Sequence, residues 1–169
     1  YTAKLEELNK DLAAAPAGKF DGHKVVVSGI IYNMPGLLKA MDDTKLGVAA
    51  DDCAYESRSF AVDAPEDLDN GLQALAVEFS IQNNDVLRYD PSYLQNTRSE
   101  HVCQLVKDSG AEGVVVFMMQ FCDPEEMEYP DLKKALDAHH IPHVKIGVDQ
   151  QTRDFGQAQT ALEAFAESL

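Results

Sequence analysis

Cys122 stands in surroundings that make a cysteine chemically useful. It follows the apolar run of residues 113–119 and comes directly before Asp123 and Pro124. Asp is a good helix N-cap, Pro is favoured at the first helical position, and Glu126 lies three residues after the predicted cap, as in a capping box. We therefore expect a buried strand, then Cys122, then a helix whose positive end favours the thiolate, the form that binds metals. The alternative is a small apolar side chain that completes the strand.

The other cysteines and a histidine group are weaker candidates. Cys53 ends a second apolar run, whereas Cys103 falls on the apolar stripe of a predicted helix and is expected to pack there. No Walker A motif, GxGxxG, GxSxG or HExxH pattern occurs in the sequence. Three histidines cluster where a helix ends and a strand begins, and we expect them to face solvent rather than to bind a metal: His139, His140 and His143.

The composition restricts the class of protein. The 169 residues provide for one domain or a piece of a larger chain, and 45% hydrophobic residues suffice for a true core. A net charge of −15 argues against nucleic acid and anionic membranes as partners. No stretch approaches the roughly 18 apolar residues of a membrane span. Three cysteines without a framework spacing favour a reducing compartment, so the predicted location is the cytoplasm. The start at Tyr1 indicates processing, trimming or a fragment.

Strands and helices are predicted to alternate along the chain, which favours a parallel sheet with helices on both faces. We expect an N-terminal helix and linker over residues 1–22 and one Rossmann-like α/β domain over residues 23–169. The predicted strands span residues 23–31, 46–50, 114–119 and 143–148. The predicted helices span residues 4–14, 35–43, 65–82, 92–109 and 124–139, followed by a last helix with its apolar stripe between Phe155 and Leu169. The simplest arrangement is a flavodoxin-like three-layer sandwich with a four-stranded parallel sheet in the order 2-1-3-4.

That strand order brings three candidate segments to one edge of the sheet, where open α/β proteins bind their ligands. Ser28 lies late in the first strand, Cys53 follows the second and Cys122 follows the third. With strands about 4.8 Å apart, the two cysteines would stand roughly 10 Å apart at the backbone, and their side chains could reach a shared inorganic cluster. A direct disulfide is not expected, because it needs Cα atoms within about 7 Å.

Several blocks of the sequence resemble the 2-hydroxyacyl-CoA dehydratase and benzoyl-CoA reductase family. The resemblance covers most of the chain from about Lys24 to the end and corresponds to the second, C-terminal domain of one subunit. The block around Cys122 with the Tyr-Pro pair after it is fairly specific, and the other blocks are individually weak. The matching segments are Ser28-Gly29, residues 34–38, residues 51–58, residues 121–126, Tyr129-Pro130, residues 132–136, residues 141–143, residues 149–151 and residues 157–169.

The resemblance implies a function and its partners. Members of this family are oxygen-sensitive enzymes of anaerobes, built from two related subunits of two Rossmann-like domains each. An ATP-hydrolysing activator protein delivers an electron, and a ketyl radical of the 2-hydroxyacyl-CoA thioester then eliminates water. By this resemblance, a [4Fe–4S] cluster would be completed by an N-terminal domain outside this sequence, and the isolated chain would be inactive. The alternatives are an acyl-CoA reductase of the benzoyl-CoA reductase type, a non-catalytic electron-relay or scaffold domain, and a flavodoxin-like binding module.

The resemblance also implies roles for single residues. Cys122 matches the cluster-ligand block, and soft thiolates suit an iron–sulfur cluster. Cys53 is a second candidate ligand, although some members carry the cysteine one position later, where this sequence has Ala54. Gly147 stands where many members have an acidic residue. The candidate catalytic residues are Ser28, Glu56, Arg58 and Glu126. Simpler roles stay open for two of them: Arg58 could pair with Asp51 or Asp52, and Ser28 could have a turn role.

Overall fold

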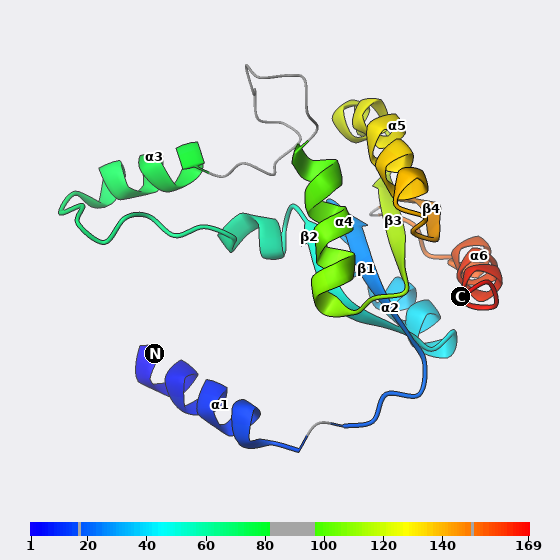
Figure 1. The fold of residues 1–169 in the computed structure, drawn as a ribbon, viewed down its shortest axis with the longest axis horizontal. Helices are drawn as coiled ribbons and strands as arrows, with labels where there is room; N and C mark the ends of the chain where they lie inside the picture. The colour runs from blue at the N-terminus through cyan, green and yellow to red at the C-terminus, as the bar shows by residue number, and fades with distance from the viewer. Residues whose placement is uncertain (17, 82–96, 150) are drawn as a thin grey trace.

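Four parallel strands form the centre of the molecule. The computed structural model describes residues 1–16, 18–81, 97–149 and 151–169. The strands are β1 (His23–Gly29), β2 (Leu46–Cys53), β3 (Gly113–Met119) and β4 (His143–Val148), and they lie in the order β2-β1-β3-β4 (Figure 1). This order confirms the predicted parallel α/β sheet and its topology. β1 and β3 are adjacent, so the sheet reverses its winding between them, which is where open α/β folds bind ligands.

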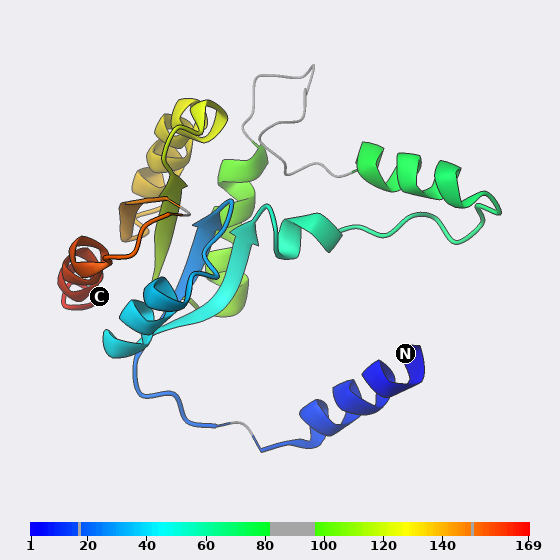
Figure 2. The same ribbon diagram turned by 180° about the vertical axis from the view of Figure 1, so that it is seen from behind.

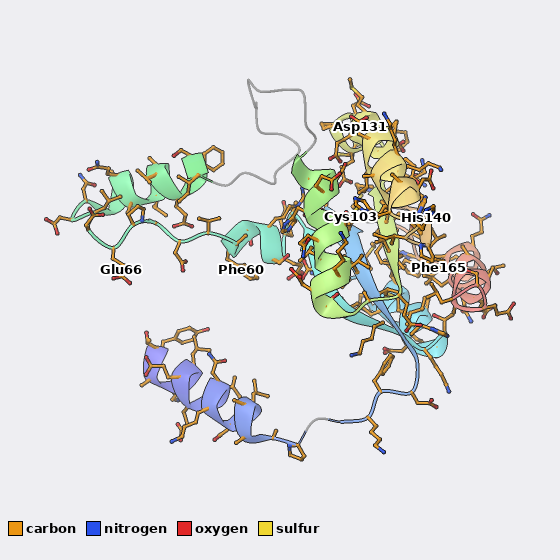
Figure 3. All side chains as sticks on the ribbon, in the orientation of Figure 1. Phe60, Glu66, Cys103, Asp131, His140 and Phe165 are labelled. Atoms are coloured by element: carbon orange, nitrogen blue, oxygen red, sulfur yellow. The ribbon has the colours of Figure 1, made fainter. Side chains whose placement is uncertain are left out.

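Helices cover both faces of the sheet and make it a three-layer sandwich. Helices α2 (Pro35–Asp43) and α6 (Gly156–Ala166) cover one face, and α4 (Thr97–Ser109) and α5 (Asp123–Ala138) cover the other. Each face has its own core cluster, and Figure 3 labels one member of each, Cys103 on α4 and Phe165 on α6. Both faces of the two central strands are buried, and β3 and the middle of β1 are accordingly apolar.

The central valines explain why the sheet is stable. Val25 and Val27 point toward α2 and α6, whereas Val26 points toward α4 and α5, and all three are fully buried. A buried valine side chain contributes about 1.5–3 kcal/mol relative to an exposed one. A charged residue at position 26 would therefore break the core on the α4 and α5 face. Strand β3 repeats this alternation with Val114, Val115 and Val116.

Two helices lie outside the core. Helix α3 (Gly71–Ile81) begins six residues later than predicted, because the Asn70 carboxamide accepts hydrogen bonds from the backbone N–H groups of Leu72 and Gln73 and caps the helix there. Its apolar side chains do not reach the core: Leu72 and Phe79 are 81% and 80% exposed. Helix α3 projects from the sheet at the end of an arm that begins near Phe60 and passes Glu66 (Figures 1, 2 and 3).

The N-terminal helix α1 (Thr2–Ala14) also lies apart from the sheet in both views (Figures 1 and 2), and it has no buried residue. The division of the chain at residue 22 stays a prediction. Helix α4 begins at Thr97, and the expected residues 92–96 of that helix lie outside the described residues. Within the described part of the chain, no helix has both the length and the apolar character needed to cross a lipid bilayer.

Candidate functional site

The carboxyl ends of β1 and β2 send neighbouring side chains to opposite faces of the sheet. Ser28 pairs in register with Asp52, and Gly29 pairs with Cys53. Side chains alternate along a strand, so the first pair faces α4 and α5 while the Cys53 thiol faces α2 and α6. Ser28 Oγ donates a hydrogen bond of 3.1 Å to Asp52 Oδ2, and both residues are fully buried. A buried carboxylate of this kind needs a cation beside it.

Arg98, at the start of α4, supplies that cation. Its Nε donates to Asp52 Oδ2 at 2.8 Å, and its Nη2 donates to Ser28 Oγ at 2.9 Å. Only 4% of Arg98 is exposed, so these charged hydrogen bonds form away from water and are stronger than surface pairs. Burial alone would lower the pKa of Arg98, but the carboxylates around it raise that pKa and keep the guanidinium charged.

The same guanidinium reaches the first two turns of α5. Arg98 Nη1 binds Glu128 Oε2, and Arg98 Nη2 lies 3.7 Å from Glu125 Oε1. Glu125 is buried, which raises the pKa of its carboxyl group, while Arg98, Arg58 and hydrogen bonding from the Met119 backbone oppose the shift. A single side chain of α4 therefore joins the ends of β1 and β2 to the start of α5.

Arg58 completes the buried charges from the other side. Asp51 Oδ1 accepts hydrogen bonds from the Ser57 hydroxyl and backbone N–H, which folds the chain after β2 into the short 3-10 helix η1 (Ser57–Phe60). Arg58 Nη2 then donates to the Gly29 carbonyl at 2.8 Å, and its Nε lies 3.6 Å from Asp52 Oδ1. Arg58 is 6% exposed and pairs with Asp52, one of the two partners considered for it. Its guanidinium is thus turned inward, toward Asp52 and the Gly29 carbonyl.

Gly29 permits this approach of loop and strand. It has φ of +153°, and a Cβ at this position would collide with the backbone carbonyl of Phe117 on β3. The Gly29 carbonyl accepts hydrogen bonds from both Ala54 N–H and Arg58. Glu56 lies between these two residues, is partly buried, and uses its backbone N–H to bind the Cys53 carbonyl. The block of residues 51–58 is therefore a compact loop that encloses the end of β1.

Cys53 is fully buried in the core on the α2 and α6 face, where its Sγ lies 3.8 Å from the Val27 carbonyl. Burial, together with the nearby carboxylates of Asp51 and Asp52, raises the pKa of this thiol far above its ordinary value. These surroundings stabilise the protonated thiol and are unsuited to a thiolate ligand. The geometry thus favours a packing role for Cys53 over the expected site that it would share with Cys122.

Cys122 is partly exposed at the start of α5, just beyond the end of β3. Its backbone N–H donates to the Met119 carbonyl at 3.2 Å, and its own carbonyl accepts from Glu126 N–H at 3.0 Å. Cys122 itself is the N-cap residue, so the prediction that Asp123 is the cap was off by one position. Asp123 instead belongs to an acidic first turn that suits the positive helix end. The thiol thus lies at a helix N-terminus on the edge of the sheet where ligands bind.

Glu126, His139 and His140 are exposed, whereas only 12% of the His143 side chain is exposed, so the prediction that the histidines face solvent was wrong for His143. Glu126 is exposed on α5, and its carboxylate accepts from Lys145 Nζ at 3.5 Å. His143 begins β4, so it lies at the opposite edge of the sheet from Cys122, and His139 follows the far end of α5, where its Nε2 lies 3.3 Å from Glu100 Oε2.

Cys122 can supply one ligand to a metal cluster, but it does not form a complete metal site. Among the described residues, no group of three or more His, Cys, Asp or Glu side chains could hold a metal ion. Of the three cysteines in the sequence, two are fully or almost fully buried in the core clusters and only Cys122 reaches the surface. Any cluster bound here must therefore take its other ligands from residues beyond the described part of this chain.

Sequence comparisons identify the family to which the chain belongs. The architecture defines a Rossmann-like or flavodoxin-like parallel α/β protein. The chain belongs to the family described as 2-hydroxyglutaryl-CoA dehydratase, D-component, whose family model matches residues 1–169. It is 89% identical over 169 residues to the (R)-2-hydroxyglutaryl-CoA dehydratase, subunit beta, of Acidaminococcus fermentans, with 100% of this chain and 45% of that protein aligned.

More distant relatives define the range of the family. The (R)-phenyllactyl-CoA dehydratase beta subunit of Clostridium sporogenes is 35% identical over 169 residues, covering 100% of this chain and 44% of that protein. A benzoyl-CoA reductase subunit of Thauera aromatica is 23% identical over 175 residues, covering 98% of this chain and 45% of that protein. The chain thus spans about half the length of the curated relatives that it matches.

The sequence reasoning missed Arg98, Glu125 and Glu128, which carry most of the buried charge contacts. A signal for two of them exists in the helical spacing. Arg98 lies one and two turns before the buried Val102 and Val106 on the same face of α4. Glu125 lies on the stripe of α5 that carries the buried Leu132. A charged residue on an otherwise inward stripe predicts a buried ion pair.

Proposed function

We propose that this chain is a component of a 2-hydroxyacyl-CoA dehydratase, a lyase that removes water from a 2-hydroxyacyl-CoA thioester. Membership of the 2-hydroxyglutaryl-CoA dehydratase D-component family supports this proposal, as do two relatives whose names identify them as beta subunits of acyl-CoA dehydratases. The identity of 89% to the (R)-2-hydroxyglutaryl-CoA dehydratase subunit favours (R)-2-hydroxyglutaryl-CoA as the substrate of the complete enzyme.

The single observation that carries the chemical part of the proposal is the placement of Cys122. It is the one cysteine of the chain that is not buried in a core cluster, and it lies at a helix N-terminus beside the point where the sheet reverses its winding. Cys122 would supply one thiolate ligand to a [4Fe–4S] cluster whose remaining ligands come from outside the described residues. When bound, such a cluster supplies the single-electron chemistry of the dehydration.

The chain's own residues favour an electron-relay role for this domain. Ser28 and Arg58, both proposed as catalytic from the sequence, are buried and bound to Asp52, Arg98 or Gly29. Glu126 faces solvent and binds Lys145, and Glu56 belongs to the loop that encloses β1. Since these side chains hold the strand ends together, the substrate would be bound elsewhere in the assembly. This domain would hold the cluster in place and shield from water the side of the cluster that faces it.

Partners follow from this proposal. The domain would act in an assembly with a homologous second subunit and would receive electrons from an ATP-hydrolysing activator protein in the cytoplasm. The net charge of −15 argues against a nucleic acid as a partner of this domain.

The test is made on the complete assembly, purified without oxygen. The wild-type assembly is expected to be brown, to contain iron and inorganic sulfide, and to dehydrate (R)-2-hydroxyglutaryl-CoA when activator and ATP are added. Benzoyl-CoA is the control substrate, and its reduction in place of the dehydration would favour the reductase alternative. An assembly that contains no iron would refute the proposal.

The isolated chain of residues 1–169 gives a second test. It should fold, because its sheet and four covering helices form two core clusters of their own. It should show no turnover of a 2-hydroxyacyl-CoA, because one thiol cannot hold a cluster. Measurable turnover by this polypeptide without any partner would contradict the proposal.

A further inference from the structure

Arg98 connects four elements at the edge of the sheet where Cys122 lies. It comes from α4, binds Ser28 at the end of β1 and Asp52 at the end of β2, and reaches Glu125 and Glu128 on α5. The arginine and its β1 and β2 partners are at least nine-tenths buried. A guanidinium has five donors in a rigid plane, so one Arg can fix several acceptors in a defined geometry, which a lysine cannot.

The position of Cys122 depends on the segment that Arg98 holds. Cys122 forms the last backbone link between β3 and α5, through Met119 and Glu126. Glu125 and Glu128 lie in the next turns of α5, on the side that faces α4. The turn that contains Cys122 is thus held by its own backbone hydrogen bonds and, through Glu125 and Glu128, by Arg98.

The balance of charges makes this arrangement depend on Arg98. Three carboxylates, those of Asp52, Glu125 and Glu128, gather around it, and Arg58 is the second cation close to them. Without Arg98, the carboxylates of α5 would face Asp52 across the interface with α4 and repel it in a poorly solvated space. The start of α5 would then move away from the sheet or take up water, and Cys122 would move with it.

We infer that Arg98 is the positioning residue for Cys122, holding the start of α5 so that the thiol presents a fixed geometry to the cluster. This inference rests on the proposed function. Residues that orient metal ligands from behind typically affect metal affinity by 10- to 100-fold when they are replaced. Arg98 would act in this way through α5, without touching the cluster.

The experiment compares three variants of the complete assembly, purified without oxygen. Arg98→Met removes the charge but keeps much of the length of the side chain, and Arg98→Lys keeps the charge without the planar fork. Lys133→Met is the matched control, because it breaks an exposed pair with Asp137 on the same helix. The readouts are the electron paramagnetic resonance spectrum of the reduced cluster, the rate of iron release to a chelator, and thermal stability.

We expect Arg98→Met to alter the spectrum and to release iron about tenfold faster than wild type. The spectrum and the iron release rate of Arg98→Lys should lie between those of Arg98→Met and wild type, and those of Lys133→Met should match wild type. If Arg98→Met lowers thermal stability while the spectrum and the release rate stay at wild-type values, Arg98 is only structural and the inference is wrong. Where Arg98→Met fails to assemble, Arg98→Lys decides: wild-type values in that variant overturn the inference.

Alkylation of the thiols separates failure of this inference from failure of the proposed function. An assembly without iron would refute the cluster, but Cys122 could still be labelled with iodoacetamide and compared between variants. If Arg98 positions the turn, Cys122 in Arg98→Met reacts several-fold faster than in wild type, while the buried Cys53 and Cys103 stay protected. Equal rates at Cys122 in the two proteins would overturn the positioning role whether or not a cluster binds.

Discussion

The ends of β2 and β3 look alike in the sequence and differ in the folded protein. Each is an apolar strand that leads to a cysteine at the same edge of the sheet: Cys53 is the last residue of β2, and Cys122 follows β3. Cys53 is still part of its strand, so the alternation of the strand turns its thiol into the core beside α2 and α6. Cys122 has already left its strand and caps a helix on the other face.

The difference shows what makes a cysteine available for chemistry. Burial raises the pKa of Cys53 and keeps it protonated, whereas Cys122 is partly exposed beside the positive end of α5. Both cysteines lie at the end of a strand. Whether the cysteine is still part of the strand, with its side chain pointing into the core, or already belongs to the following helix decides between a packing role and a ligand role. Variants at and around the two cysteines test this comparison.

The largest effect is expected for Cys122→Ala in the complete assembly. This variant should lose most of its iron and sulfide and accept no electron from the activator, because a thiolate ligand is removed. Cys53→Ala is the paired variant and should keep wild-type iron content, because its thiol lies in the core. Iron analysis and the visible spectrum, measured without oxygen, give the answer. A wild-type iron content in Cys122→Ala, or an equal loss of iron in both variants, would contradict the difference between the ends of β2 and β3.

A large loss of stability is expected for Asp52→Asn, beside Cys53. Asp52 is fully buried and pairs with both Arg58 and Arg98, so its removal leaves two buried guanidinium groups without their shared carboxylate. Such a change costs about 3–5 kcal/mol. Urea unfolding of the chain of residues 1–169 would measure it. Asp137→Asn, which affects an exposed pair with Lys133, is the control and should leave the unfolding midpoint close to that of wild type. Equal midpoints for the two variants would contradict the buried charge cluster.

The pH dependence of stability should report the burial of Cys53. Its pKa in the folded chain is raised above the ordinary value of 9.0, so the folded chain holds a proton that the unfolded chain releases. The stabilisation is complete below that value and is lost as the pH rises above it. At about pH 10, wild type should lose about 1.4 kcal/mol more than Cys53→Ala, relative to neutral pH. Parallel pH profiles of the two proteins in urea titrations would show that the thiol is not buried.

The smallest effect is expected for Cys103→Ala. Cys103 lies on α4 within the core cluster of that face, where it was predicted to pack, and burial raises the pKa of its thiol. Replacing it should cost about 1 kcal/mol at most and leave the iron content of the assembly unchanged. Urea unfolding and iron analysis would check both statements. A loss of iron in this variant would show that chemistry is not confined to the exposed thiol.

The apolar patterns of α1 and α3 predicted the two helices, but the tertiary structure does not bury their apolar side chains. The stripes of α1 and α3 have helical spacing, and both segments are helices, but Leu8 and Leu72 are 51% and 81% exposed. Periodicity determines local structure through backbone geometry, and it carries no information about which surface, if any, a stripe meets. The Asn70 cap likewise moved the start of α3, because a carboxamide that bonds two N–H groups competes with the helical pattern before it.

The sequence by itself determined the parallel sheet, its strand order and the position of Cys122 between strand and helix, because these follow from local periodicity and from the short, right-handed connections of α/β folds. Only the tertiary structure decided that Cys53 is buried, that Arg58 turns inward to Asp52, and that Arg98 joins four elements. Contacts of this kind link residues as distant in the sequence as Ser28 and Arg98. They depend on how several elements pack and which charges they bring together, and no local sequence pattern encodes this.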